Sequence, residues 1–217
     1  MPPITWDGVG EKLYESGVDH GVLYLPDASG VYNSGFPWNG LVGVTESPTG
    51  AEPSAQYADN IKYLSLISAE EFGATIEAFT YPDEFAECDG TAVPEPGVAV
   101  GQQSRKMFGL SFRTKVGNDV EGMDFGYKLH LVYGCQAAPS EKAYATINDS
   151  PEALTFSWEV TTTPAPVTGL KPTSLIVVDS TVVDPADLTA LEALLYGATL
   201  APALPTPDAV IALFSTP

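Results

Sequence analysis

The sequence predicts a mainly β protein: an antiparallel β-sandwich or barrel-like domain with a short flanking helix and a small α/β appendage at the C-terminal end. Apolar and polar residues alternate with a period of two over 107–116, 126–134 and 154–161, which is typical of half-buried antiparallel strands. The 20 glycines and 19 prolines show no period, as expected where many short strands are joined by turns. With 217 residues, 44% of them hydrophobic, the chain is large enough to bury a core.

The first of these strands has the clearest alternation. Phe108, Leu110 and Phe112 fall on one face, and Arg113 and Lys115 fall on the other. The apolar face is expected to lie on the core and the charged face in solvent. Further strands are expected at 21–25, 39–45, 61–67, 72–81, 143–148, 174–179 and 208–214.

Two helices are expected as well. A short helix should run from Tyr81 to near Gly90, because acidic residues in its first turn complement the helix dipole. A longer helix should cover 185–196, where Asp184 can cap the start and Gly197 can close the end.

Two irregular stretches divide the chain. Residues 46–60 are rich in Pro, Gly and Ser and are predicted to form a long loop, and loops of this length in a compact domain tend to be functional. Residues 162–166 read as a stiff linker after the last strong strand. The sequence therefore predicts a β domain over 1–165, followed by a linker and appendage over 166–217.

The acidic charge is distributed unevenly. The chain carries 28 acidic and nine basic residues, a net charge of −19. Residues 1–104 hold 16 acidic and two basic residues, whereas 105–142 hold six basic and four acidic ones; 143–217 return to a net of −7. So negative a field repels nucleic acid and argues against a DNA-binding protein. The one cationic segment could instead dock on an acidic neighbour of the same kind, which hints at self-association.

Other features predict a soluble, cytosolic product. No stretch approaches the roughly 18 uninterrupted apolar residues of a membrane span, and the N-terminus lacks the basic and apolar regions of a secretion signal. Cys88 and Cys135 lie far apart in the sequence and are expected to be reduced, half-buried thiols, although a disulfide stays possible if the strands bring them together.

A search for chemistry finds little. No nucleophile elbow, phosphate-binding loop, dinucleotide fingerprint or zinc-protease motif is present, and His20 and His130 are 110 residues apart. Residues 119–124 offer three carboxylates without the spacing of a calcium loop, so a solvated hairpin tip is expected there. We therefore expect no catalytic residue, no metal and no cofactor.

Several stretches resemble one family. They are residues 6–24, which begin Trp6-Asp7-Gly8-Val9-Gly10, and residues 57–64, 71–85 and 105–113. Over roughly residues 1–165 the chain resembles the major tail proteins of long, non-contractile-tailed phages of Gram-positive, actinobacterial hosts. The resemblance rests on overall pattern, because no catalytic signature anchors it.

The resemblance implies a structural virion protein that is made in the host cytoplasm and assembles into stacked hexameric rings, the tail tube. Phage DNA would pass through the tube without specific binding. The other implied partners are tape-measure, tail-terminator and distal-tail proteins, and no membrane is involved. The expected subunit and ring contacts are made by Arg105, Lys106, Arg113, Lys115, Pro48 and Asp59, and Glu77 is the candidate for facing the lumen.

Two alternatives stay open at this point. One is a β-sandwich module that binds carbohydrate or another ligand through Trp6, Tyr14, Phe36 and Trp38, although these aromatics fit packing in the sandwich better. The other is an enzyme that uses scattered carboxylates, which predicts a tight catalytic constellation that the sequence does not show.

Overall fold

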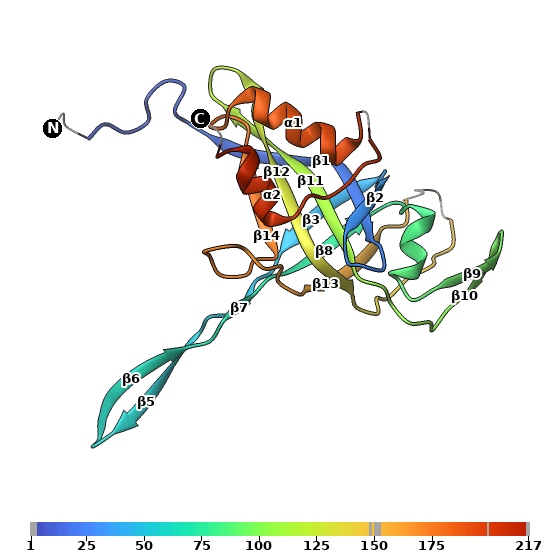
Figure 1. Ribbon diagram of the computed structural model, residues 1–217, viewed down its shortest axis with the longest axis horizontal. Helices are drawn as coiled ribbons and strands as arrows, with labels where there is room; N and C mark the ends of the chain where they lie inside the picture. Colours follow the sequence, from blue (N-terminus) through green and yellow to red (C-terminus); the bar gives the residue numbers. More distant parts are fainter. Residues whose placement is uncertain (1–3, 148, 150–152, 199, 216–217) are drawn as a thin grey trace.

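The computed structural model describes residues 4–147, 149, 153–198 and 200–215. The chain is mainly β, as predicted, with 46% strand, 12% helix and antiparallel pairing. An eight-stranded sheet forms the body in the order β2-β1-β11-β12-β13-β8-β3, and β14 pairs with β12 (Figure 1). Its strands are β1 (Tyr14–Pro26), β2 (Tyr32–Pro37), β3 (Leu41–Glu46), β8 (Gly73–Ala78), β11 (Phe108–Asn118), β12 (Gly122–Ala137), β13 (Phe156–Thr162) and β14 (Leu175–Asp179).

The inner face of the sheet carries the first core. Trp158 of β13 packs there against Phe85, with ring centroids 5.2 Å apart, and Phe85 packs in turn against Phe108. The sheet curls around this core, because a Cβ placed on Gly21 of β1 would lie 3.1 Å from Leu41 of β3. Cys88 and Cys135 are free thiols and are fully buried in this core, not half-buried as expected.

The C-terminal helices cover part of the outer face and make a second core. Leu188, Leu191 and Leu195 of α1 (Pro185–Tyr196) pack with Leu129 and Leu131 of β12, and α2 (Pro207–Leu213) joins them. The central strands β11 and β12 are therefore covered on both faces over much of their length, where the sequence predicts half-buried strands. The segment predicted to be an appendage lies on the main sheet, because its strand β14 pairs antiparallel with β12.

The longer predicted helix is confirmed as α1. The Asp184 carboxylate accepts a hydrogen bond from the Ala186 amide at 2.8 Å, and Gly197 ends the helix in the left-handed region with φ of 74°. The strand predicted at 208–214 is wrong, because residues 208–213 belong to α2. Thr206 caps that helix and Pro207 opens it, signals that favour a helix over a strand.

Other predicted elements differ in detail. The short helix is a single 3₁₀ segment, η1 (Asp83–Glu87), which buries Phe85. In the strand predicted at 143–148, residues 143–147 are irregular and leave Tyr144 and Ile147 in solvent, and residue 148 lies outside the described residues. The strands predicted at 107–116, 126–134, 154–161, 21–25, 39–45, 61–67, 72–81 and 174–179 all contain strands of the structure.

Two hairpins project from the body. The larger one, here called the arm, spans residues 47–72 and contains β4 (Thr49–Gly50), β5 (Pro53–Ala58), β6 (Ile61–Ile67) and β7 (Glu70–Glu71). The smaller one consists of β9 (Ala92–Glu95) and β10 (Val98–Val100). The expectation of a long loop over 46–60 is wrong, because most of these residues form strands that pair with β6 and β7.

Candidate assembly surfaces

Arg113, predicted to contact a neighbouring subunit, is held inside the chain. Its guanidinium donates to both Asp19 oxygens at 2.7 and 3.2 Å and lies 4.6 Å from the centre of the Tyr127 ring. Partial burial opposes ionisation of Asp19, but the hydrogen bonds from Arg113 hold the pKa of this carboxyl below its ordinary value. The pair fixes β1 to β11 at a register shift, so Arg113 serves the fold of the subunit.

Arg105 is also used internally, in a cluster around Asp89. The carboxylate of Asp89 is 6% exposed and accepts hydrogen bonds from Arg105 at 3.4 Å, Lys142 at 2.5 Å and the Trp158 indole at 3.2 Å. Arg105 also donates to the carbonyl oxygens of Ala137 and Ala138. This cluster ties η1, the end of β12 and the segment after it to the first core.

The two remaining lysines of the predicted interface differ. Lys106 forms a solvent-exposed ion pair with Glu87. Lys115 has no ion-pair or hydrogen-bond partner in the part of the chain that the structure describes, and it is only half-buried. Of the four cations expected to meet another subunit, Lys115 is therefore the one whose charge is not matched within its own chain.

Glu77 lies on an open part of the outer sheet face. It is exposed on β8, opposite Ser157 of β13 and Gly43 of β3, while its neighbour Ile76 points into the first core. Glu159 of β13 is exposed on the same side, next to Thr75. The outer face is thus apolar and helix-covered over β1, β11 and β12, but polar, acidic and uncovered over β13, β8 and β3.

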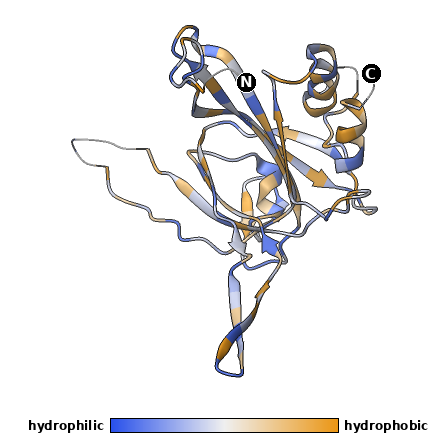
Figure 2. Cartoon of the chain, turned by 90° about the vertical axis from the view of Figure 1, so that its left-hand side faces the viewer, coloured by the Kyte–Doolittle hydropathy of each residue, from blue (hydrophilic) through white to orange (hydrophobic). Residues whose placement is uncertain are grey.

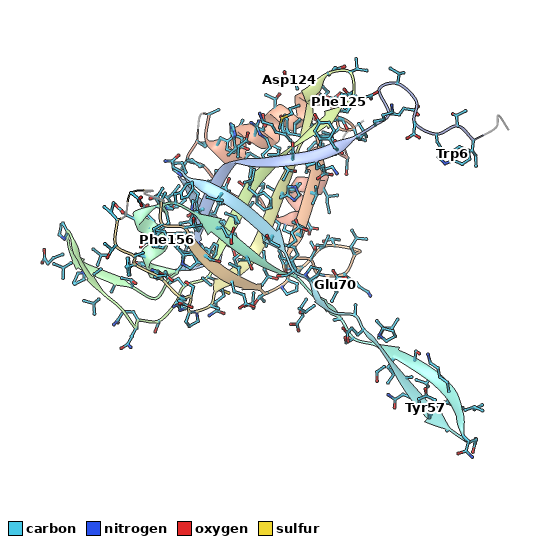
Figure 3. The ribbon with its side chains drawn as sticks, turned by 180° about the vertical axis from the view of Figure 1, so that it is seen from behind. Trp6, Tyr57, Glu70, Asp124, Phe125 and Phe156 are labelled. Carbon is cyan, nitrogen blue, oxygen red and sulfur yellow. The ribbon has the colours of Figure 1, made fainter. Side chains whose placement is uncertain are left out.

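The arm is the most unusual surface. Every residue of β6 is exposed, including Ile61, Tyr63 and Ile67, which are 63%, 67% and 68% exposed, and on β5 Tyr57 is 73% exposed. Figure 2 shows apolar residues along the arm, and Figure 3 shows Tyr57 near its tip, far from the body. A two-stranded hairpin without a core is at best marginally stable in water, so covering this arm would stabilise it.

The two predicted interface residues of this segment lie at its two ends. Pro48 is exposed at the base, and Asp59 lies in the turn at the tip. Asp59 and Asn60 both have positive φ, 51° and 63°, the conformation of a type I′ hairpin turn. This Asp-Asn pair between two strand-like runs is the sequence signal that identifies the arm, and the prediction of a loop missed it.

The two histidines do not form a common site. His130 is stacked on Phe112 at 4.5 Å, and its Nε2 lies 3.0 Å from the Thr114 hydroxyl. Its Nδ1 is 3.3 Å from the carboxylate of Glu46, at the base of the arm, and burial lowers the pKa of the imidazole. His20 is exposed beside Asp19. Among the described residues no group of three metal-ligating side chains comes together.

Three further features considered in the sequence are the turn after β11, the aromatic residues and membrane-spanning helices. The turn after β11 is closed by Asn118, whose side-chain oxygen accepts hydrogen bonds from the backbone amides of Val120 and Glu121, as expected for a hairpin tip. Trp38, one of the aromatics considered for ligand stacking, is 3% exposed in the first core, whereas Trp6 is exposed. No helix within the described ranges has the length and apolarity needed to cross a bilayer.

Comparison with known proteins adds no family. No family model matches the chain, and no curated protein matches it.

Proposed function

We propose that the chain is a structural subunit that self-assembles into stacked hexameric rings and forms the tail tube of a long-tailed phage. The observation that carries the proposal is the arm, a solvent-exposed hairpin with large apolar side chains along β6, Tyr57 on β5 and no core beneath them. A second copy of the chain is the partner that such a projection fits, because repetition of one contact builds an extended assembly.

The physical argument for a covered arm is energetic. Burying apolar surface contributes about 25 cal/mol per Å², so covering one large apolar side chain is worth about 1.5–3 kcal/mol. The arm exposes Tyr57, Ile61, Tyr63, Leu64, Leu66 and Ile67. Covering several of these residues would act against the repulsion between subunits that each carry a net charge of −19.

The open outer face of β13, β8 and β3 supports a lumen. It carries Glu77 and Glu159, which are exposed and have no ion-pair partner among the described side chains. Carboxylates repel DNA phosphates over a Debye length of about 8 Å at physiological salt. Six such faces around a bore let a polyanion pass without binding, which is the requirement for a DNA conduit.

The remaining assignments rest on the resemblance of residues 1–165 to major tail proteins. They are location in the virion after assembly in the host cytoplasm, and contact with tape-measure, tail-terminator and distal-tail proteins. The alternative of a carbohydrate-binding module is weakened, since Trp38 is buried in the first core and Phe36 packs against it, which leaves Trp6 and Tyr14 as the exposed members of the four aromatics.

Negative-stain electron microscopy of the concentrated protein tests the proposal. We expect rings or tubes of the width of a phage tail, in an amount that rises with protein concentration. Lower salt should reduce assembly, because it lengthens the range of repulsion between the acidic subunits. Monodisperse monomers at every salt and protein concentration would exclude a self-assembling subunit, and glycan binding by those monomers would favour the alternative.

A further inference from the structure

A groove of about 740 Å³ lies between η1 and the β9–β10 hairpin. Apolar side chains of Leu25, Val93 and Val98 line part of it. Val93 and Val98 are about half exposed, so the groove has an uncovered apolar wall. Its volume is in the range of about 300–1,000 Å³ that is typical of binding pockets.

The other wall of the groove is acidic, and part of its charge is unmatched. Glu87 is paired with Lys106, and the buried Asp89 is paired with Arg105 and Lys142. Asp83 and Glu84, in the first turn of η1, are exposed and have no cationic partner within the described ranges. The groove therefore fits a partner that is apolar and carries a positive charge.

The tip of the arm has this composition. Lys62 is the single basic residue between residues 13 and 104 of the sequence, and it has no ion-pair partner in the described part of the chain. It lies opposite Tyr57 in the hairpin register, and Ile61 and Tyr63 flank it. Lys62 is thus flanked by exposed apolar and aromatic side chains at the end of the arm, and the carboxylate of Asp59 in the adjoining turn is the one acidic group beside it.

The topology places tip and groove at opposite ends of the subunit. β8 begins at Gly73, where the arm ends, and runs to Ala78, from which a short segment leads into η1 at Asp83. Six residues of strand span about 20 Å. Figure 1 shows the arm and the β9–β10 hairpin extending in different directions from the body, so the arm points away from the groove of its own chain.

We propose that the arm tip of one copy binds in the groove of the next copy, where Lys62 pairs with Asp83 and Glu84 and the apolar tip residues cover Val93 and Val98. This docking rests on the proposed function and names the surface that receives the arm. The two surfaces differ, so the contact is heterologous, and between stacked rings it leaves free arms at one end of the stack and free grooves at the other. That arrangement propagates a stack of subunits without a closing step.

Cysteine cross-linking tests the contact directly. In a chain with Ile61→Cys and Val98→Cys, mild oxidation should join neighbouring copies and give a ladder of oligomers on a non-reducing gel. The matched control is Ile67→Cys with Val98→Cys, because Ile67 is as exposed as Ile61 but lies at the other end of β6. The native thiols contribute little background, since both are buried and burial raises the pKa of Cys88 to about 12.

The outcomes separate the docking site from the function. A ladder for the Ile61 variant and none for the control supports the docking. Tubes in micrographs of the same variant without a ladder would overturn the docking site while leaving the tube proposal intact. Absence of any assembly in the unmodified protein would overturn both.

Charge reversal provides a second, independent test. Lys62→Glu should raise the protein concentration needed for assembly about two- to fivefold, the range expected from an exposed ion pair. Adding Glu84→Lys to this variant should restore assembly, because the pair is then formed with the signs exchanged. Both residues are exposed, so folding should be unaffected. Failure of the double variant to recover any assembly would argue against the pairing.

Discussion

Removal of the Asp89 carboxylate should be the most destabilising single change in this chain outside the apolar core. The variant Asp89→Ala leaves Arg105 and Lys142 without a counter-charge and the Trp158 indole without an acceptor. Breaking a buried ion pair costs about 3–5 kcal/mol. The two cations are 22% and 27% exposed, so water recovers part of this loss, and we expect the free energy of unfolding to fall by about 2–4 kcal/mol.

Glu87 provides the matched control for this measurement. It lies in the same 3₁₀ helix and pairs with Lys106, but the two side chains are 53% and 65% exposed. Glu87→Ala should therefore cost less than about 1 kcal/mol. Both losses can be measured by urea unfolding, followed by tryptophan fluorescence at a protein concentration too low for assembly. Equal, small losses for the two variants would refute the reasoning that burial decides the strength of these pairs.

Three further predictions concern assembly and pH. Replacing residues 51–69 by a short glycine linker should leave a folded monomer with an unchanged urea midpoint that forms no stacked tubes in micrographs; normal tubes from it would remove the arm from the contact. Glu77→Lys with Glu159→Lys should retain assembly but bind DNA in a salt-dependent retention assay, and no gain of DNA binding would place this face away from the bore. Burial lowers the pKa of His130, so the unfolded chain takes up its proton first as the pH falls. The stability from this residue should be present above about pH 6.5 and decline as the pH falls below it, and His130→Gln should flatten that decline in unfolding curves; an unchanged slope would contradict it.

Local patterns predicted much of the sheet. The alternation over 107–116 and 126–134 located β11 and β12, and the Asp184 and Gly197 caps located α1 almost to the residue. These features depend on neighbours within a few positions, where the period of apolar residues and the chemistry of caps act. The Asp59-Asn60 turn at the arm tip is a local signal of the same kind.

The pairing of distant residues could not be predicted in the same way. Arg113 meets Asp19 across 94 positions of sequence, and Lys142 meets Asp89 across 53. A net cationic segment therefore looked available for a neighbouring subunit, whereas folding had already matched most of its charge. The same limit applies to Leu188 and Leu191, because no local pattern tells which face of which strand will receive a helix.

The arm is attached to the body by two very short connections, residues 47–48 after β3 and Phe72 before β8; β3 is hydrogen-bonded to β8, and β8 to β13. Tension applied at the tip consequently runs parallel to those strands and at right angles to their ladder of hydrogen bonds. The hydrogen bonds between neighbouring strands are then loaded together in shear, so none of them breaks before the others. A filament whose subunits are joined through their arms would resist stretching along its axis. Each arm could still pivot at the irregular residues between β3 and β4.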